Sequence, residues 1–422
     1  MEREPLATDN WWDLRDLSNI SREILDIAER IGGSELAYIV APVIGFVAAF
    51  LLFVLPSQLI LGVYGERKLI GRMQSRLGPN RVGPFGLLQP IADAIKLMQK
   101  EALTPKGADR VVMYIAPIVF VAPAVMLFAV IPFGPNMIIA DIPVALLYFL
   151  AMASIPVIAS FMAGWSSNNK YSLFGAMRIV AMTISYEIPL VLTLLSVVLI
   201  TGTLSLQEMV WWQSDNYIWL VFISPLALVI VFIAASVETN RTPTDIAEAE
   251  SEIVAGYLTE YSGMRWGLFY GMDIAYAIAA AAFSATIFLG GWSLFGLEQW
   301  VPPWLIFIMK THFLYFIFIW TRGTLPRLRI DQLMALSWKY MLPLAAANLL
   351  LIAVQRLIIV EFEIETSAIW WLYGVINLAF AVVLGVAWAR VLGYRPWASP
   401  TRPRLVSEAG GYVPVDTRKG TG

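Results

Sequence analysis

The chain has 422 residues, of which 59% are hydrophobic and 14% are charged, and its formal net charge is −2. This composition excludes a soluble domain of this size and predicts a polytopic membrane protein, while the balanced charge argues against a nucleic-acid-binding surface. The sequence holds no cysteine and a single histidine, His312, so it cannot build a disulfide, a Cys-ligated iron–sulfur cluster or a two-histidine haem site. Any electrons involved must come from a partner.

Residues 1–35 form a mostly polar and acidic N-terminal extension. Five aliphatic residues in it recur at alternating spacings of three and four: Leu17, Ile20, Ile24, Ile27 and Ile31. This period predicts an amphipathic surface helix. The first long apolar run begins near Leu36 and exceeds the core of a signal peptide, so we interpret it as a membrane span.

Nine apolar segments near the ~20 residues that a bilayer requires predict an all-α bundle of about nine transmembrane helices. Their approximate ranges are 38–64, 111–131, 142–164, 174–201, 218–237, 266–290, 303–321, 339–360 and 369–392. Lysine and arginine occur in the loops after the odd-numbered spans and are absent from the loops after the even-numbered ones. By the positive-inside rule, the N-terminus lies outside and the C-terminus is cytoplasmic. The chain therefore divides into the extension 1–35, a transmembrane domain 36–392 and a cytoplasmic tail 393–422, with no evident internal repeat.

The first cytoplasmic loop, residues 65–110, is rich in charge, glycine and proline. It breaks at Gly78-Pro79 and at Gly83-Pro84 and resumes as an amphipathic segment over about 87–100. Asp93 and Lys96 are three residues apart and can pair on one helix face. Two interpretations of this loop stay open: a functional cytoplasmic surface, and a re-entrant helix that its basic residues anchor at the lipid headgroups.

A second loop, residues 238–265, has an unusual density of acids. Against one base, Arg241, residues 238–261 carry six carboxylates: Glu238, Asp245, Glu248, Glu250, Glu252 and Glu260. If the chain is helical from about Ile246, residues 248 and 252 share a face and Glu250 lies opposite. Helix capping by Asp245 and Glu248 is the plainer alternative, but it leaves four carboxylates unexplained.

Several ionisable residues fall inside the predicted spans, where they are costly and are functional candidates by default. Glu187 lies near the middle of the fourth span, Asp273 two turns into the sixth, and Lys310 near the middle of the seventh, while Glu238 ends the fifth. A structural ion pair between Glu187 and Lys310 is one interpretation. The other is a proton path, because buried carboxylates at successive depths can pass protons.

Five motifs between about residues 60 and 345 suggest a family. They are ERKLIGRMQSRLGPNRVGPFGLLQPIADAIKL, SYE, ETNRTPTDIAEAESEIVAGYLTEYSGM, FLGGW and RGTLPRLRIDQLMALSWK. Together they resemble the H subunits of the proton-pumping NADH:quinone oxidoreductase, respiratory complex I. The resemblance implies a protein of a prokaryotic plasma (inner) membrane that forms the quinone-access chamber and couples quinone reduction to proton translocation. It implies that this chain binds no cofactor, that quinone is the substrate, and that FMN and iron–sulfur clusters lie in partner subunits.

The resemblance also implies roles for individual residues and for partners. Arg67, Asp93 and Lys96 would line or support the quinone channel, and Arg241 would be a counter-charge of the acidic loop. The carboxylates implied in proton coupling are Glu187, Glu238, Glu248, Glu250, Glu252, Glu260 and Asp273. The partners would be other membrane-arm subunits, the peripheral subunits at the quinone site, quinone itself and membrane lipid.

The sequence departs from the family pattern at three places. Thr244 stands where relatives have the phenylalanine of PFD, Asp273 stands where they have a glutamate, and the stretch MASIPV offers Ile155 where many carry a membrane glutamate. Two alternatives stay open. One is the homologous subunit of a membrane-bound hydrogenase, and the other is a stand-alone ion transporter that uses Glu187 and Lys310.

Overall fold

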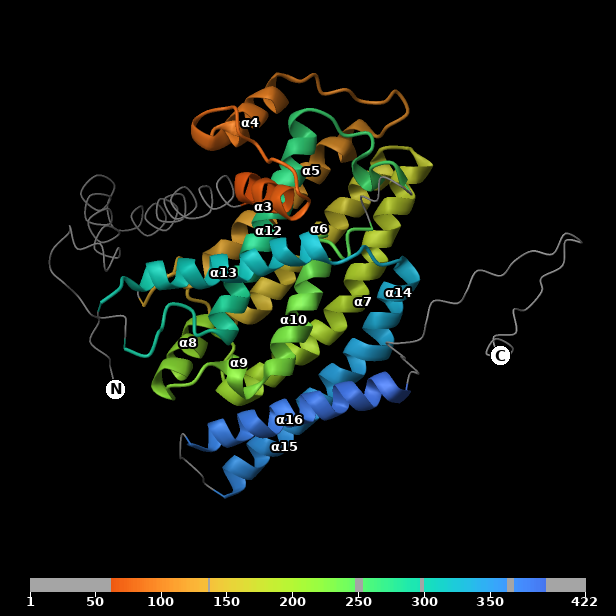
Figure 1. Cartoon of the computed structure of the whole chain (residues 1–422). Coiled ribbons are helices and arrows are strands. Elements are labelled where there is room, and N and C mark those ends of the chain that lie inside the picture. Colours follow the sequence, from red (N-terminus) through yellow and green to blue (C-terminus); the bar gives the residue numbers. More distant parts are fainter. Residues whose placement is uncertain (1–61, 136, 247–252, 297–299, 363–367, 392–422) are drawn as a thin grey trace, which may run out of the picture. The chain divides into compact units, whose positions relative to one another are not determined.

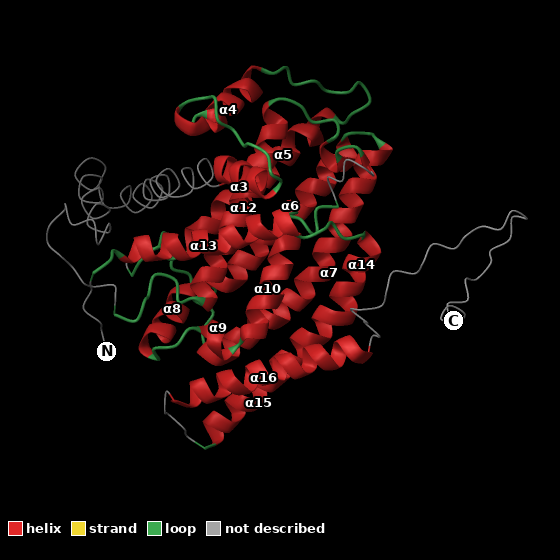
Figure 2. Ribbon diagram, in the orientation of Figure 1, coloured by secondary structure: helices red, strands yellow, loops and turns green. Residues whose placement is uncertain are grey.

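The computed structural model describes residues 62–135, 137–246, 253–296, 300–362 and 368–391. Within these ranges the chain is built from helices and loops and contains no β-strand (Figure 2). The all-α prediction is therefore confirmed. The predicted N-terminal helix, most of the first span, Glu248, Glu250, Glu252 and the tail lie outside the described residues.

Seven helical stretches in the described part are long and apolar enough to cross a membrane. They are α5 with η4 (Arg110–Met126, Leu127–Val130), α6 (Ala145–Ser166), α7 (Lys170–Thr201), α12 (Met264–Phe288), α13 (Pro303–Thr324), α14 with η7 and α15 (Ile330–Ala335, Leu336–Met341, Leu342–Glu361), and α16 (Ala368–Val391). Each coincides with a predicted span. The match follows from the length of the apolar runs alone, because a spanning helix needs about 20 such residues.

The fifth predicted span is divided into two helices. α9 (Leu220–Ile223) ends at Ser224 and α10 (Pro225–Glu238) follows directly. Proline at the first position of α10 removes an amide donor, so the helical ladder cannot continue through it. Side chains of two other helices bind at this break: Asn377 Nδ2 of α16 donates to the Ile223 carbonyl at 2.7 Å, and Ser224 Oγ donates to Asn348 Oδ1 of α15 at 3.2 Å.

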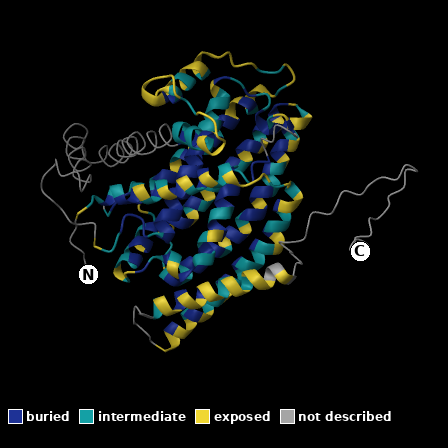
Figure 3. Ribbon diagram, viewed as in Figure 1, coloured by how far each residue is buried: buried dark blue, intermediate teal, exposed yellow. Residues whose placement is uncertain are grey.

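The interior is organised around α7 and α12. α7 packs against α6, α10 and α15, and α12 packs against α5 and α13. α12 owes its deep burial to the run of small residues from Ala277 to Ala282, which lets neighbouring helices approach closely (Figure 3). Phe149 of α6 stacks on Phe283 of α12 at a ring-centroid distance of 3.9 Å.

Shorter helices in the loops complete this part of the chain. They are α3 (Glu66–Met73), η3 (Pro84–Gly86), α4 (Gln89–Gln99), α8 (Leu206–Asp215) and η5 (Gly256–Leu258). α4 confirms the predicted amphipathic segment, and it lies at the same end of the bundle as α3 (Figure 1). Its Leu97 packs close to Gly267 of α12, which fixes α4 across the end of that helix.

The chain beyond Ala379 is assigned to a second unit. Of this unit the structure describes residues 380–391, which are the last turns of α16.

Candidate functional site

A buried ionic cluster joins the ends of three helices. Glu66 at the start of α3 accepts hydrogen bonds from Arg241 Nη1 at 2.8 Å, just after α10, and from Arg322 Nη1 of α13. The side chains of Glu66 and Arg241 are 5% and 7% exposed. Burial opposes ionisation of Glu66, but the two guanidinium groups outweigh it and hold the pKa of Glu66 below its usual value. This carboxylate therefore stays charged.

A second ion pair links α3 to α4. Arg67 Nη1 donates to Asp93 Oδ2 at 2.5 Å, and Gln89 Nε2 donates to Asp93 Oδ1 at 3.0 Å. Lys96 Nζ lies 3.9 Å from Asp93 Oδ1, which confirms the predicted pairing on one helix face. Burial again opposes ionisation, but the hydrogen bonds from Arg67 and Gln89 and the charges of Arg67 and Lys96 together outweigh it, so the pKa of Asp93 is lowered. The structure thus brings together the three residues that the resemblance assigned to the quinone channel.

The start of the acidic loop is held differently. Asp245 Oδ2 accepts a hydrogen bond from Arg327 Nη2 at 3.1 Å, and the Leu328 amide donates to the Pro243 carbonyl at 3.1 Å. Here burial outweighs the nearby arginines and raises the pKa of Asp245. Arg241, which the resemblance implied as a counter-charge of this loop, has Glu66 as its ion-pair partner.

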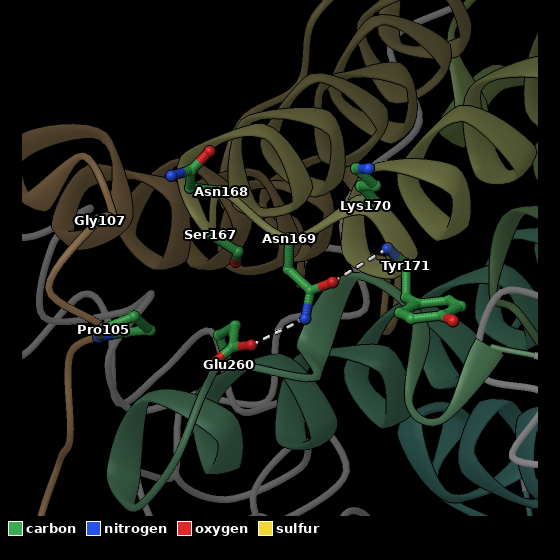
Figure 4. A pocket seen from close by; sticks show the side chains of 8 residues that line it. All are labelled: Pro105, Gly107, Ser167, Asn168, Asn169, Lys170, Tyr171 and Glu260. Carbon is green, nitrogen blue, oxygen red and sulfur yellow. Dashed lines mark hydrogen bonds between the residues drawn. The ribbon is translucent and has the colours of Figure 1, made fainter.

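Glu260 lies at the other end of the same loop. Its Oε1 accepts a hydrogen bond from Asn169 Nδ2 at 2.8 Å, and the two residues line an open hollow of about 460 Å³ beside Tyr171 (Figure 4). Asn169 also caps α7, because its Oδ1 accepts the Tyr171 amide at 3.0 Å. Glu260 is therefore fixed to the beginning of the helix that carries Glu187.

Within the membrane helices, Glu187 of α7 contacts a polar group of the neighbouring helix α6. Its Oε1 accepts a hydrogen bond from Ser154 Oγ. Ser154 Oγ also lies 3.0 Å from the Leu150 carbonyl oxygen. α7 packs against α10 as well, and α10 ends with a second carboxylate, Glu238.

Ser154 is a residue that the sequence analysis missed. It directly precedes Ile155 in the stretch that was compared only for an acid, although a hydroxyl can also hydrogen-bond a carboxylate. Glu66 directly follows the region of the first predicted span, and nothing in the sequence indicated its two partners. Asp273 lies half-buried on α12, one turn before Tyr276, whose hydroxyl donates to the Phe120 carbonyl at 2.8 Å.

Lys310 makes contacts at the C-terminal end of α12. Its Nζ donates to the carbonyls of Leu289 and Ser293 at 2.6 and 2.5 Å and lies 4.8 Å from the ring centroid of Trp219. Carbonyls at a helix C-terminus attract a cation, so these contacts give Lys310 a structural role at that terminus. The interpretation as a partner of Glu187 gains no support from them.

The described residues contain no group of three or more His, Asp or Glu side chains that could hold a metal ion. The described residues instead offer ion pairs at the ends of the helices. Inside the membrane helices they offer polar side chains such as Ser154 and Glu187, which can exchange hydrogen bonds.

The chain is similar to known proteins over most of its length. Residues 44–353 match the model of a family described as NADH dehydrogenase. The chain is 49% identical over 334 residues to the H subunit of the NADH-quinone oxidoreductase of Dehalococcoides mccartyi strain CBDB1, covering 79% of this chain and 90% of that protein. It is 47% identical over 310 residues to the H subunit of Bacillus cytotoxicus, covering 73% and 92%, and 47% identical over 304 residues to that of a Geobacillus species, covering 72% and 91%.

Proposed function

Because the chain belongs to the NADH dehydrogenase family, among relatives named as the H subunit of NADH-quinone oxidoreductase, we propose that it forms the quinone-access chamber of such a complex and couples quinone reduction to proton translocation. It is a multi-pass protein of the prokaryotic plasma membrane, and other subunits of the complex are its partners. The sequence has no cysteine. In this proposal the flavin and the iron–sulfur clusters belong to partner subunits, and this chain contributes a binding wall and a proton path.

The proposed wall of the chamber is the corner between α3 and α4. A quinone has a polar headgroup and an apolar tail, and this corner offers both kinds of surface. Arg67 and Asp93 supply a charged pair, and α4 leaves Ile91, Ile95 and Met98 exposed along one face. That apolar face suits lateral entry of the tail from the bilayer, while the ion pair fixes the angle between the two helices.

The proposed proton path runs through Glu187. A carboxylate inside an apolar helix is costly, so a structural role alone is a weak explanation for it. Glu187 accepts a hydrogen bond from a hydroxyl of α6, and Glu238 ends α10, the neighbouring helix on another side of α7. A hydroxyl and a second carboxyl group are groups with which a residue can exchange protons. This position of Glu187 is the observation on which the proposal rests.

Coupling between the chamber and the path is electrostatic. Two unit charges about 10 Å apart interact by roughly 1.7 kcal/mol at an effective dielectric constant of about 20. That energy corresponds to about a tenfold change in proton occupancy. A charge that changes during quinone reduction therefore acts strongly enough to load or unload a nearby carboxylate, provided that the surrounding ion pairs keep their own charge.

The experiment is a comparison of Glu187→Gln and Glu361→Gln in the intact complex, reconstituted into vesicles and supplied with NADH and quinone. Glu361 is an exposed acid at the end of α15, so it serves as the matched control. We expect Glu187→Gln to lower proton pumping and quinone reduction together by on the order of tenfold, because the two are coupled. Pumping at the wild-type rate in Glu187→Gln would remove this residue from the path.

A further inference from the structure

The turn of α7 that carries Glu187 contains a backbone carbonyl without a helical donor. Pro189 lies four residues after Ser185 and has no amide hydrogen, so the Ser185 carbonyl loses its usual partner. In the interior of a membrane, where water is absent, such a carbonyl needs a hydrogen-bond donor from another part of the protein. Ser337 Oγ fills this role and donates to Ser185 O at 2.5 Å.

Ser337 belongs to the π-helical segment η7 (Leu336–Met341), and single π-helical turns occur frequently at functional sites. The same region holds the α7 turn at two further points. Trp338 Nε1 donates to Ser185 Oγ at 3.2 Å, and the Tyr186 hydroxyl donates to the Leu333 carbonyl at 2.8 Å. Ser185 and Tyr186 are thus fixed to the α14–η7 region, and the next residue along the chain is Glu187.

The other end of this stretch contacts the beginning of the acidic loop. Arg327 pairs with Asp245, and the Leu328 amide donates to Pro243 O. A continuous piece of chain, residues 327–338, therefore touches the charged loop at one end and the Glu187 turn at the other. From Ile330 onward this stretch is helical, because α14 is followed directly by η7.

A second proline-freed carbonyl provides an internal comparison. Pro117 in α5 leaves Met113 O without its helical donor, and the Tyr261 hydroxyl donates to this carbonyl at 3.3 Å. Both carbonyls are satisfied by a side chain from another segment. The one bound by Ser337 lies two residues from a proposed proton-carrying group.

We propose that Ser337 is a positioning residue for Glu187: through the carbonyl that Pro189 frees, residues 327–338 hold the Glu187 turn and transmit movement of the acidic loop to it. The inference rests on the proposed function of Glu187. It adds a mechanical connection to the electrostatic one.

The test uses four variants of the whole complex in vesicles, namely Ser337→Ala, Ser337→Thr, Pro189→Ala and the double variant Pro189→Ala/Ser337→Ala. Ser337→Ala leaves a buried carbonyl without a donor, and we expect it to lower coupled turnover by on the order of tenfold, with the quinone KM unchanged. Ser337→Thr keeps the hydroxyl and retains activity. In the double variant, alanine at position 189 returns an amide donor to Ser185 O, so that activity recovers relative to Ser337→Ala.

Two results would overturn the inference. One is wild-type pumping in Ser337→Ala. The other is a double variant that assembles but does not recover, and this second result decides the matter even if Ser337→Ala alone fails to assemble. Glu187→Gln is measured alongside: wild-type pumping there defeats the proposed function, whereas loss there together with normal Ser337→Ala defeats only the present inference. Combining Glu187→Gln with Ser337→Ala should give no further loss, because the two residues act as one unit.

Discussion

The carboxylates of α3 and α4, Glu66 and Asp93, and the carboxylate Glu187 inside a membrane helix have opposite surroundings. Glu66 and Asp93 each contact an arginine, and their pKa values are lowered in spite of burial. Glu187 accepts a hydrogen bond from a neutral serine hydroxyl, and the next helix, α10, ends with a second carboxyl group, Glu238. An acid that is held charged by two bases is suited to fixing helices in place, and an acid among neutral groups and other acids is suited to exchanging protons. Glu66 and Asp93 therefore belong to a structural framework of fixed charges, whereas Glu187 belongs to the proposed proton path.

The largest expected effect comes from breaking the framework. Glu66→Gln leaves Arg241 buried beside a neutral side chain, and removing one partner of a buried pair costs about 3–5 kcal/mol. We expect a large loss of assembled complex and a lower inactivation temperature of what remains. Arg67→Ala is the matched comparison, because the Arg67 side chain is 41% exposed. If Glu66→Gln were as stable as Arg67→Ala, the cluster would not be a framework.

The next effect concerns the path. Ser154→Ala removes the hydroxyl that donates to Glu187, a hydrogen bond worth roughly 1 kcal/mol or more. Coupled turnover is expected to fall about three- to tenfold, measured as NADH-driven proton uptake into vesicles. Ser154→Thr keeps the hydroxyl on the same helix face and should retain most activity. Equal losses in both variants would indicate a packing role for this position.

Asp245 shares a feature with each kind of carboxylate, because it pairs with an arginine and yet its pKa is raised. The pH dependence of stability therefore distinguishes Asp245 from Glu66. The pKa of Asp245 is raised in the folded chain, so wild-type stability falls as pH rises through the window between the unfolded and folded values of this pKa. Asp245→Asn mimics the protonated form. We expect it to match or exceed wild-type thermal stability at neutral pH, by up to about 1 kcal/mol, with the difference vanishing in acid.

The ionisation of Glu66 affects the pH dependence of stability in the opposite direction. Its folded pKa is lowered, so its contribution is fully present above the ordinary glutamate pKa of about 4.3 and is lost only as pH falls through the lowered value. Thermal inactivation of the complex measured between pH 5 and 8 should therefore show no dependence that Glu66→Gln removes. A stability change in this range that disappears with Glu66→Gln would contradict the assignment of a permanent charge.

The smallest effect concerns the chamber. Arg67→Ala removes one side of the charged corner, and a half-exposed ion pair is worth up to about 1 kcal/mol. We expect a several-fold rise in the apparent quinone KM with little change in kcat. Lys100→Ala is the control, since Lys100 is exposed at the end of α4 and has no role in the proposed channel. An unchanged KM in Arg67→Ala would limit Arg67 to anchoring α3.

The lengths of the apolar runs and the spacing of nearby residues made much of the fold predictable from the sequence. They located the spans, α4 and the pairing of Asp93 with Lys96, because each of these depends on residues close in sequence. The break of the fifth span at Pro225 was not predicted, although it follows from the missing amide of this proline. The contacts of Glu66 with Arg241 and Arg322 join residues 175 and 256 positions apart, and that of Ser154 with Glu187 crosses two helices. Such contacts depend on how helices pack, which the pattern of a single segment does not contain.

The most direct measurement of the difference between framework and path is infrared difference spectroscopy of the intact complex before and after quinone reduction. The account predicts a carboxyl signal that is lost in Glu187→Gln and kept in Asp93→Asn, because only the first of these residues exchanges a proton. A signal that survives in Glu187→Gln, or that disappears in Asp93→Asn, would contradict the division between fixed and exchanging carboxylates.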